Sequence, residues 1–239
     1  DIEAGITRVT DGLQRTSTRR WNSQYQITEY TDAVGLRWRF EWNDERQLLG
    51  ATDPQGGTWQ FSYDESGNLC QSTDPLGRSE STQWLEHWSL PRLRTDSNGQ
   101  HWRFRYDRRG NCISETDPLG HPTRYRYDAH GLRVESIDAA GKRNQLRWNA
   151  FGQLTEHVDC SGHSTHFSYD RRGHLQAEID ATGERIEYQH DRQGRLVRTV
   201  LADGRSEHYQ FDAAGNLATH IDPAGHTRRY VYDRRGKLR

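Results

Sequence analysis

The chain has 239 residues, of which 31% are hydrophobic, and a formal net charge of −1. This charge excludes a bulk electrostatic attraction to nucleic acid or to an anionic membrane, and no apolar run approaches the roughly 20 residues of a membrane span. Such a polar composition is common in disordered chains, but the 8 Trp, 11 Tyr and 6 Phe recur at regular spacing. We therefore expect a folded chain whose few apolar residues gather on one face of a long sheet.

The ends and the cysteines of the chain give little further information. The sequence contains no methionine and opens with no signal peptide. We expect a processed piece or an internal fragment of a longer protein, with residues 1–10 leading in from a preceding segment. The three cysteines, Cys70, Cys112 and Cys160, are far apart and odd in number, so they do not predict a disulfide framework.

A 21-residue repeat begins at Asp11 and is marked by a D-x-x-G turn in nearly every unit. The step is 21 residues throughout, except for 22 between Asp74 and Asp96, and Leu201 replaces the aspartate in one unit. The carboxylate of such a turn accepts hydrogen bonds from nearby backbone amides, and glycine supplies the positive φ. We expect residues 11–239 to form an array of about eleven repeats, the last one truncated.

A second turn, Y-D-x-x-G-x-L, follows about halfway through each unit, with Trp148, Phe211 or His190 in place of the tyrosine in some units. The unit at 74–95 is irregular, because it carries the extra residue and has Pro91 where a glycine-bearing turn is expected. We expect a bulge or a local break there. The residues that we expect to hold the repeat together are Asp53, Gly56, Tyr63, Asp64, Gly67, Leu69, Asp117, Gly120, Tyr127, Asp128, Gly131, Asp159, Gly162, Tyr169, Asp170, Gly173, Leu175, Asp222, Gly225, Tyr232, Asp233, Gly236 and Leu238.

The segments between the turns have the length and the alternation of β-strands. Apolar and polar residues alternate in the first segment of a unit, as in residues 59–63 and 102–106. In the second segment a leucine begins the inward set and a β-branched residue ends it, as with Leu154 and Val158. The sequence therefore predicts an all-β protein of tandem hairpins in a long, twisted, coiling antiparallel sheet, with one face lined by Trp, Tyr, Phe and Leu and the other charged.

The combination of Y-D-x-x-G-x-L with D-x-x-G at this period resembles the Rhs/YD-repeat family, which includes bacterial Rhs polymorphic toxins, the cocoons of Tc toxins and the teneurins. The resemblance covers the chain from Asp11 to Arg239. It implies a strip that spirals into a hollow shell around a C-terminal toxin domain. It also implies a polypeptide made in the bacterial cytoplasm and then secreted or delivered, with type VI secretion and interbacterial competition as the setting. The implied partners are the remainder of the shell, the enclosed toxin, and secretion-apparatus components or a chaperone.

The family's autoproteolytic D-P-x-G-L segment is not expected in this stretch. Residues 74–77 and 117–120 both read D-P-L-G, but Arg78 and His121 follow where the motif requires leucine. Both stretches lie in the repeat register, so we interpret them as ordinary turns. No spike, plug or toxin module is visible in the sequence, and the chain would supply only part of a shell.

Competing interpretations concern metals, sugars and catalysis. His157, Cys160, His163 and His166 are the best candidates for a zinc site. Cys160 and His163 flank a D-x-x-G turn, however, and only alternate residues of a strand share a face, so we expect no metal or other cofactor. Each turn offers one carboxylate, whereas calcium takes six or more oxygens. No catalytic motif is present and we expect no enzyme. The alternative function is a carbohydrate-binding or cell-surface adhesion module, in which aromatic rows that include Trp59 and Trp102 would stack on sugars.

Overall fold

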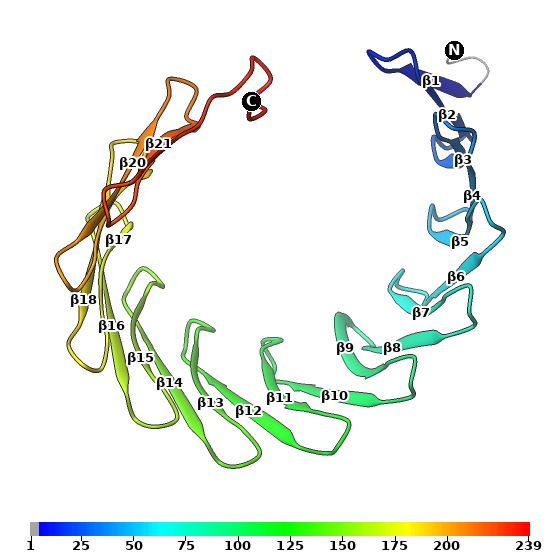
Figure 1. Cartoon of the computed structure of the whole chain (residues 1–239). Helices are drawn as coiled ribbons and strands as arrows, with labels where there is room; N and C mark the ends of the chain where they lie inside the picture. The colour runs from blue at the N-terminus through cyan, green and yellow to red at the C-terminus, as the bar shows by residue number, and fades with distance from the viewer. Residues whose placement is uncertain (1–4) are drawn as a thin grey trace. The chain divides into compact units, whose positions relative to one another are not determined.

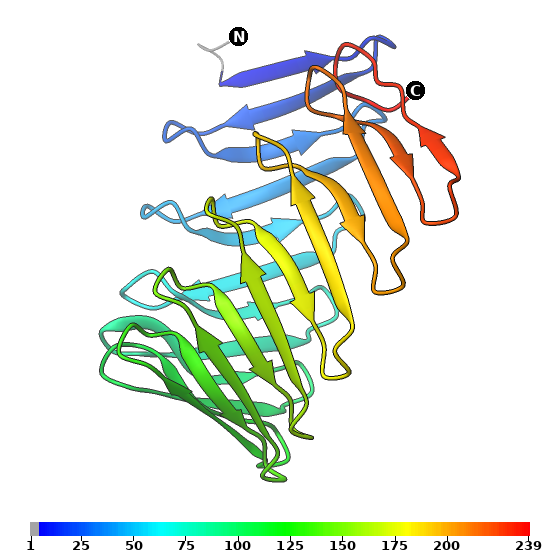
Figure 2. The same cartoon turned by 90° about the vertical axis from the view of Figure 1, so that its left-hand side faces the viewer.

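The computed structural model describes residues 5–239, and every regular element in that part of the chain is a β-strand. The chain divides into two compact units, residues 1–123 and 124–239, and the division falls within β12. In each unit taken by itself, successive hairpins lie side by side in chain order and form a single layer (Figures 1 and 2). The sequence therefore predicted the fold class correctly.

The strands repeat a pattern of a longer first strand and a shorter second strand. The bounds are β1 (Ile6–Thr10), β2 (Thr16–Trp21), β3 (Ile27–Thr31), β4 (Arg37–Trp42), β5 (Leu48–Thr52), β6 (Thr58–Tyr63), β7 (Leu69–Thr73), β8 (Ser79–Leu85), β9 (Trp88–Thr95), β10 (His101–Tyr106), β11 (Cys112–Thr116), β12 (Pro122–Tyr127), β13 (Arg133–Ile137), β14 (Arg143–Trp148), β15 (Leu154–Val158), β16 (Ser164–Tyr169), β17 (Leu175–Ile179), β18 (Arg185–His190), β19 (Leu196–Val200), β20 (Ser206–Phe211), β21 (Leu217–Ile221) and β22 (Thr227–Arg229).

Several first strands alternate strictly between exposed and half-buried residues. In β6, Trp59, Phe61 and Tyr63 are half-buried, and the residues between them are exposed. The same pattern recurs in β4, β10 and β14. Because successive side chains of a strand point to opposite faces, the aromatic residues of a first strand share one face, which we call the aromatic face.

All the pairings within each unit are antiparallel and join neighbours in the chain. A first strand pairs with the second strand of its own hairpin around the Y-D-x-x-G turn, as β6 does with β7. It also pairs with the second strand of the preceding hairpin around the D-x-x-G turn, as β6 does with β5. Strands such as β6, with a neighbour on each side, therefore have both of their backbone edges engaged.

A β-bulge recurs in the regular hairpins at the end that carries the Y-D-x-x-G turn. In the hairpin of β14 and β15, Arg147 lies opposite Glu156 whereas Trp148 lies opposite Leu154, so that one extra residue is accommodated in β15. The same shift occurs in the hairpins of β6 and β7, β16 and β17, and β18 and β19. The bulge changes which residues share a face, because strand side chains alternate with a period of two.

This bulge corrects one expectation about the faces. Leu154 lies opposite Trp148 and belongs to the aromatic face, but Val158 lies opposite Gln145 and Ser164, which are polar alternates of the flanking first strands. The β-branched residues therefore do not continue the inward set begun by leucine. They lie on the second face, among charged and polar side chains.

The unit at 74–95 is built as a longer hairpin. β8 has 7 residues and β9 has 8. The ladder between them shifts register twice, at Gln83/Trp84 and at Trp84/Leu85, and Trp84 lies opposite Pro91. Leu85 pairs with Trp88 across a tight turn of two residues. The backbone pairing therefore continues through the irregular unit.

Very few side chains are fully buried. Among the described residues, the buried apolar residues are Ala51 and Ala177, at 9% and 1% exposure. A single-layer sheet has no opposing layer to exclude water, so its stability comes from ladder hydrogen bonds, cross-strand pairs and turns rather than from a thick core. This places the energetic weight on the repeated turn and ladder residues.

Candidate functional site

The repeated turn has the same geometry at both ends of the hairpins. In the turn at Asp53, the Gly56 amide donates to the Asp53 carbonyl at 3.1 Å, and the Asp53 amide donates to the Gly57 carbonyl at 2.8 Å. The carboxylate Oδ1 of Asp53 accepts from the amides of Gln55 and Gly57 at 2.8 and 2.7 Å. One side-chain oxygen thus satisfies two amides of the loop, which is the reason for aspartate at this position.

The residue four places after the aspartate is a second, recurrent part of the turn. Where aspartate begins the turn, this fifth residue often donates to Oδ2, as Arg78 does to Asp74 at 2.6 Å. Where asparagine begins the turn, the fifth residue is glutamine, and the asparagine amide donates to it. These Asn–Gln contacts are Asn22–Gln26 at 2.7 Å, Asn43–Gln47 at 2.6 Å and Asn149–Gln153 at 2.8 Å. The two positions are therefore matched as hydrogen-bond donor and acceptor.

These contacts lower the pKa of turn aspartates. The pKa of Asp170 falls to about 2, first because the His174 side chain hydrogen-bonds it and second because the His174 amide does so. The pKa of Asp64 is also lowered, with Asn68 as the main cause. The ionised carboxylate is the form that the turn uses, since it accepts hydrogen bonds without donating any.

Two departures show which part of the turn is essential to its shape. At Leu201, where the aspartate is missing, the backbone bonds persist, with the Gly204 amide 2.9 Å from the Leu201 carbonyl. Asp203 now accepts from the Arg205 amide at 2.9 Å. In the first repeats of the chain, the glycine position of the turn is occupied by Gln14, Tyr25 and Arg46, with φ of 60°, 63° and 66°. The left-handed residue is thus retained even where glycine is not, at a cost for a residue with a Cβ.

The aromatic residue before the second turn caps a backbone carbonyl of the preceding hairpin. The ladder between β5 and β6 pairs only residues 50–52 with 58–60, which leaves the Leu48 carbonyl beyond its end. The Tyr63 hydroxyl donates to that carbonyl at 3.0 Å. The same contact, always to the residue 15 places earlier, is made by Trp42 to Ile27 at 2.8 Å, Trp84 to Leu69 at 3.0 Å, Tyr106 to Pro91 at 2.9 Å, Trp148 to Arg133 at 2.8 Å, Tyr169 to Leu154 at 2.8 Å and Tyr232 to Leu217 at 3.0 Å.

This contact explains why either tyrosine or tryptophan is found at that position. Both carry a polar hydrogen at the far end of a flat ring, and a buried or half-buried carbonyl without a partner is costly. Phe211 and His190 make other contacts, and the Trp21 indole donates to the Thr7 hydroxyl at 3.2 Å. The guanidinium of Arg195 lies 4.6 Å from the Phe211 ring centroid, and the His190 ring stacks on His174 with centroids 4.9 Å apart.

The glycines of the two kinds of turn differ in their surroundings. A Cβ on Gly56, Gly120 or Gly162, in the D-x-x-G turns, would meet nothing within 4 Å. Glycines of the second turns are instead covered by a side chain from the second turn of the preceding hairpin. The covering pairs are Gln47 on Gly67, Trp88 on Gly110, Leu132 on Gly152, Gln153 on Gly173, His174 on Gly194 and Arg195 on Gly215, whereas Gly236 is uncovered. The side chains that cover a turn glycine of the next repeat therefore gather at the second-turn edge, whereas at the D-x-x-G edge Pro75 lies 3.1 Å from the place of a Cβ on Gly57.

The structure places the repeat residues expected from the sequence in these turns and ladders. The φ angles of the glycines of the D-x-x-G and second turns are positive. In the second turns, the glycine amide donates to the aspartate backbone carbonyl. The distances are 3.0 Å at Asp64, 3.2 Å at Asp128, 3.0 Å at Asp170 and 3.0 Å at Asp233. The corresponding distances for Asp117, Asp159 and Asp222 are 3.0, 3.0 and 2.9 Å. Leu238 forms an isolated bridge with Tyr232. The energetic contribution of these residues remains a prediction.

Sequence reasoning missed three of these features. The role of the fifth turn residue could have been found from the sequence, because each asparagine that begins a turn is followed four places later by glutamine, at Asn22, Asn43 and Asn149. The aromatic cap also left a signal, the interchange of Tyr with Trp. The covering of the second-turn glycines left no signal in the sequence, because the side chains that cover them are chemically unrelated.

The candidate zinc residues do not converge. His157 lies opposite Thr165 in the ladder, whereas His166 lies opposite Glu156, so the two imidazoles project from opposite faces. His163 is a fifth turn residue with its Nδ1 3.4 Å from Asp159. Within residues 5–239, no group of three or more His, Cys, Asp or Glu side chains is placed to hold a metal ion.

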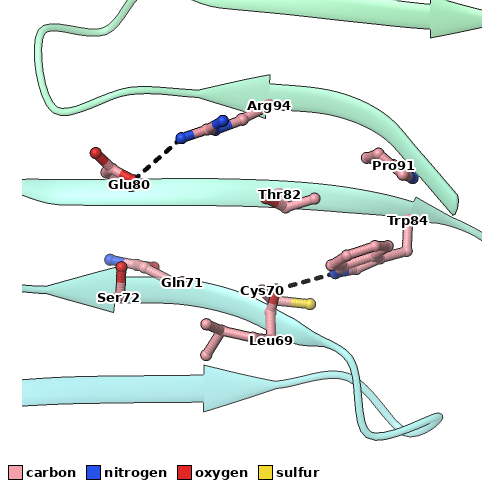
Figure 3. A pocket seen from close by; sticks show the side chains of 9 residues that line it. All are labelled: Leu69, Cys70, Gln71, Ser72, Glu80, Thr82, Trp84, Pro91 and Arg94. Atoms are coloured by element: carbon pink, nitrogen blue, oxygen red, sulfur yellow. Dashed lines mark hydrogen bonds and ion pairs between the residues drawn. The ribbon is translucent and has the colours of Figure 1, made fainter. Parts of the chain in front are cut away.

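The aromatic face is hollowed where its middle residues are small. In unit 1, a shallow hollow of about 320 Å³ has Ser72 and Thr82 among its lining residues, with Trp84 to one side. Figure 3 shows Glu80 and Arg94, 3.7 Å apart, at its other end. Trp59, one of the aromatic residues considered for stacking on sugars, stacks on Trp38 with ring centroids 5.9 Å apart. In residues 5–239, the structure has no helix that is long and apolar enough to span a membrane.

The fold and the repeated turn define a class of protein: a single-layer sheet of tandem hairpins, joined through capped turns. Residues 26–58, 42–79, 92–122, 106–143, 148–185, 169–206, 190–227 and 211–239 match the family model described as RHS Repeat. The chain belongs to this family of RHS repeat proteins. Among the curated proteins, nothing matches the chain.

Solved structures with a similar fold are Tc toxin assemblies. The crystal structure of TcdB2-TccC3-Cdc42 matches 93% of this chain with a TM-score of 0.57 at 14% identity. TcdB2-TccC3 without its hypervariable C-terminal region matches 93% at a TM-score of 0.55 and 13% identity. The Photorhabdus luminescens Tc holotoxin pore matches 94% at a TM-score of 0.51 and 13% identity. The chain covers 17%, 16% and 18% of those chains, respectively.

Proposed function

We propose that this chain is a stretch of wall in a hollow shell that encloses a polypeptide, a C-terminal toxin domain of the same protein. Family membership and the fold of the Tc toxin structures support this proposal. One of those structures is described as lacking a hypervariable C-terminal region, which is the kind of segment that a conserved shell would carry as cargo. The chain acts as a structural scaffold and carries out no catalysis of its own.

The observation that carries the proposal is the single-layer sheet. Its paired strands use both backbone edges, and its turns are closed by aspartate and glycine, so the layer presents few free amides and carbonyls. Yet Trp, Tyr and Phe residues of the aromatic face stay half-exposed. A sheet of this kind suits a barrier against proteases and solvent better than it suits a globular core. The proposed partners are the remainder of the shell and its cargo, together with secretion components or a chaperone.

The test is protection of the cargo from protease in the complete polypeptide that contains these residues. We expect the segment on the C-terminal side of the repeats to resist proteinase K in the native protein and to be digested after denaturation. Phe167→Pro removes a ladder amide from the middle of β16 and should expose the cargo. Ala181→Pro is the matched control, since Pro54 and Pro75 already occupy the corresponding position of other turns.

Three results would count against the shell. One is a cargo segment digested equally fast before and after denaturation. Another is a coding region downstream of Arg239 that holds neither further repeats nor a foreign domain. The third is binding in a glycan array that disappears in Trp59→Ala and Trp102→Ala, which would favour the carbohydrate-binding or adhesion module. The setting proposed for the shell is delivery from a bacterium, and type VI secretion remains part of the proposal.

A further inference from the structure

Three successive second-turn junctions in unit 2 use different chemistry at one position. In the first, the Gln153 amide donates to the Gly173 carbonyl at 2.9 Å. In the third, Arg195 lies over the Phe211 ring. The middle junction is the one that joins two imidazoles, because His174 stacks on His190 with centroids 4.9 Å apart and an interplanar angle of 25°.

His174 is fixed on several sides. Its Nδ1 lies 3.0 Å from Oδ2 of Asp170, and its side chain is 28% exposed. On the other side it lies against the next turn, where a Cβ on Gly194 would be 2.7 Å from its Nε2. His190 ends β18 and occupies the position where other repeats have a tyrosine or tryptophan that caps a carbonyl. At this position His190 stacks on His174 instead.

The charges around the stack do not balance two additional protons. Asp170 faces His174 from its own turn. From the next turn, Asp191 is already paired with Arg195 at 2.7 Å. Arg172 crosses the junction, since its Nη1 donates to the Arg192 carbonyl at 3.0 Å. The remaining acidic group on this face of β17, Glu178, accepts from the Tyr188 hydroxyl at 3.4 Å, and Glu187 of β18 lies on the opposite face, across from Ala177.

We propose that the His174–His190 stack is an acid-sensitive joint, which holds two consecutive repeats together at neutral pH and loosens when both imidazoles are protonated. Histidine is the side chain whose charge ordinarily changes between pH 5 and 8. One proton on His174 is matched by Asp170. A second proton, on His190, places two like charges in contact, and Arg172, which donates to the Arg192 carbonyl, adds positive charge at the same junction.

The sign of the effect follows from this arrangement. Folding brings the two imidazoles together, so charges on both of them would repel one another in the folded junction, whereas the two side chains are apart in the unfolded chain. We therefore expect the stability of the junction to fall as the pH drops below neutrality. This device concerns the acid stability of the sheet and does not depend on what the sheet encloses.

Hydrogen exchange of the whole chain at pH 7.5 and pH 5.0, corrected for intrinsic exchange rates, tests the joint. In the wild type we expect protection of the amides in residues 174–175 and 190–194 to fall about tenfold or more in acid. The junction of Arg195 and Phe211 serves as an internal reference and should change little.

Two substitutions copy the neighbouring junctions and should abolish the acid response. His190→Phe reproduces the ring of Phe211, and His174→Gln reproduces the amide of Gln153. His163→Asn is the matched control, since that histidine is 69% exposed and lies in a turn away from the stack, and it should keep the wild-type response. An unchanged wild-type profile would overturn the proposal, as would an acid response that persists in both His190→Phe and His174→Gln.

Discussion

The edge at which the repeats touch can be tested with two alanine substitutions at glycines of nearly equal backbone conformation. Gly110 has φ +84° and Gly120 has φ +85°. Placing an L-residue in the left-handed region costs about 1 kcal/mol or somewhat more, and this cost is common to both substitutions. The surroundings differ, because a Cβ on Gly120 meets nothing within 4 Å, whereas a Cβ on Gly110 overlaps Cζ3 of Trp88.

The extra cost at Gly110 comes from moving the Trp88 ring. Forcing extra atoms into a packed contact typically costs about 1–3 kcal/mol. Trp88 is 43% exposed, so its ring can swing toward solvent and the lower end of that range applies. We therefore expect Gly110→Ala to destabilise its turn by about 2 kcal/mol and Gly120→Ala by about 1 kcal/mol.

Native-state hydrogen exchange of residues 104–112 and 115–123, in separate peptides, measures the two local opening free energies. A double-mutant cycle isolates the contact, because in a Trp88→Ala background Gly110→Ala should cost no more than Gly120→Ala costs in the wild type. Equal costs for the two single variants, or a coupling energy near zero in the cycle, would refute the idea that consecutive repeats are joined by side chains at this edge.

Three further predictions concern the turns and caps. Tyr63→Phe should cost about 1 kcal/mol of local stability, because it leaves the Leu48 carbonyl without its donor. Phe211→Tyr should not destabilise the chain, because it gives the ring the hydroxyl that caps the carbonyl in other repeats. Urea titration of both variants measures these effects. Arg46→Gly should raise the urea midpoint, by up to about 1 kcal/mol in stability, because it relieves a left-handed residue with a Cβ, and a lower midpoint would contradict the assigned strain. Because the pKa of Asp170 is about 2 in the folded chain, against an ordinary value of 3.8, its stabilising effect should be complete above about pH 4 and lost between about pH 4 and 2. Unfolding midpoints measured from pH 5 to pH 2 should therefore fall less steeply in Asp170→Asn than in the wild type.

The sequence was sufficient for the strands and the turns because their causes are local. Alternation over residues 59–63 fixes which side chains share a face of β6, and Asp53 with Gly56 fixes the turn before it. The physical content of both signals lies within a few residues of the chain. Pattern reasoning therefore located the elements and their order without knowledge of any contact between hairpins.

Face assignment failed where a non-local feature intervened. The pattern alone placed Leu154 and Val158 in one inward set, but the bulge next to Trp148 lets one extra residue into β15 and separates their faces. A bulge is stabilised by the partner strand and by the turn beyond it, neither of which appears in the alternation of one strand. The carbonyl caps belong to the same class, because each joins residues 15 apart, on different hairpins.

The two edges of the repeat array should therefore differ in how strongly they hold neighbouring hairpins together. At the D-x-x-G edge, glycines such as Gly120 have no side chain over them, although Pro75 lies against Gly57, so cohesion there rests mainly on the backbone ladder. At the second-turn edge, a side chain from one repeat covers the next, and its chemistry changes from glutamine to histidine to arginine along unit 2. In a linear array, stability is a sum of repeat terms and nearest-neighbour terms. The residue at this one position therefore sets how strongly each repeat is held to the next. As a result, a chain of similar repeats has particular junctions at which neighbouring hairpins separate first.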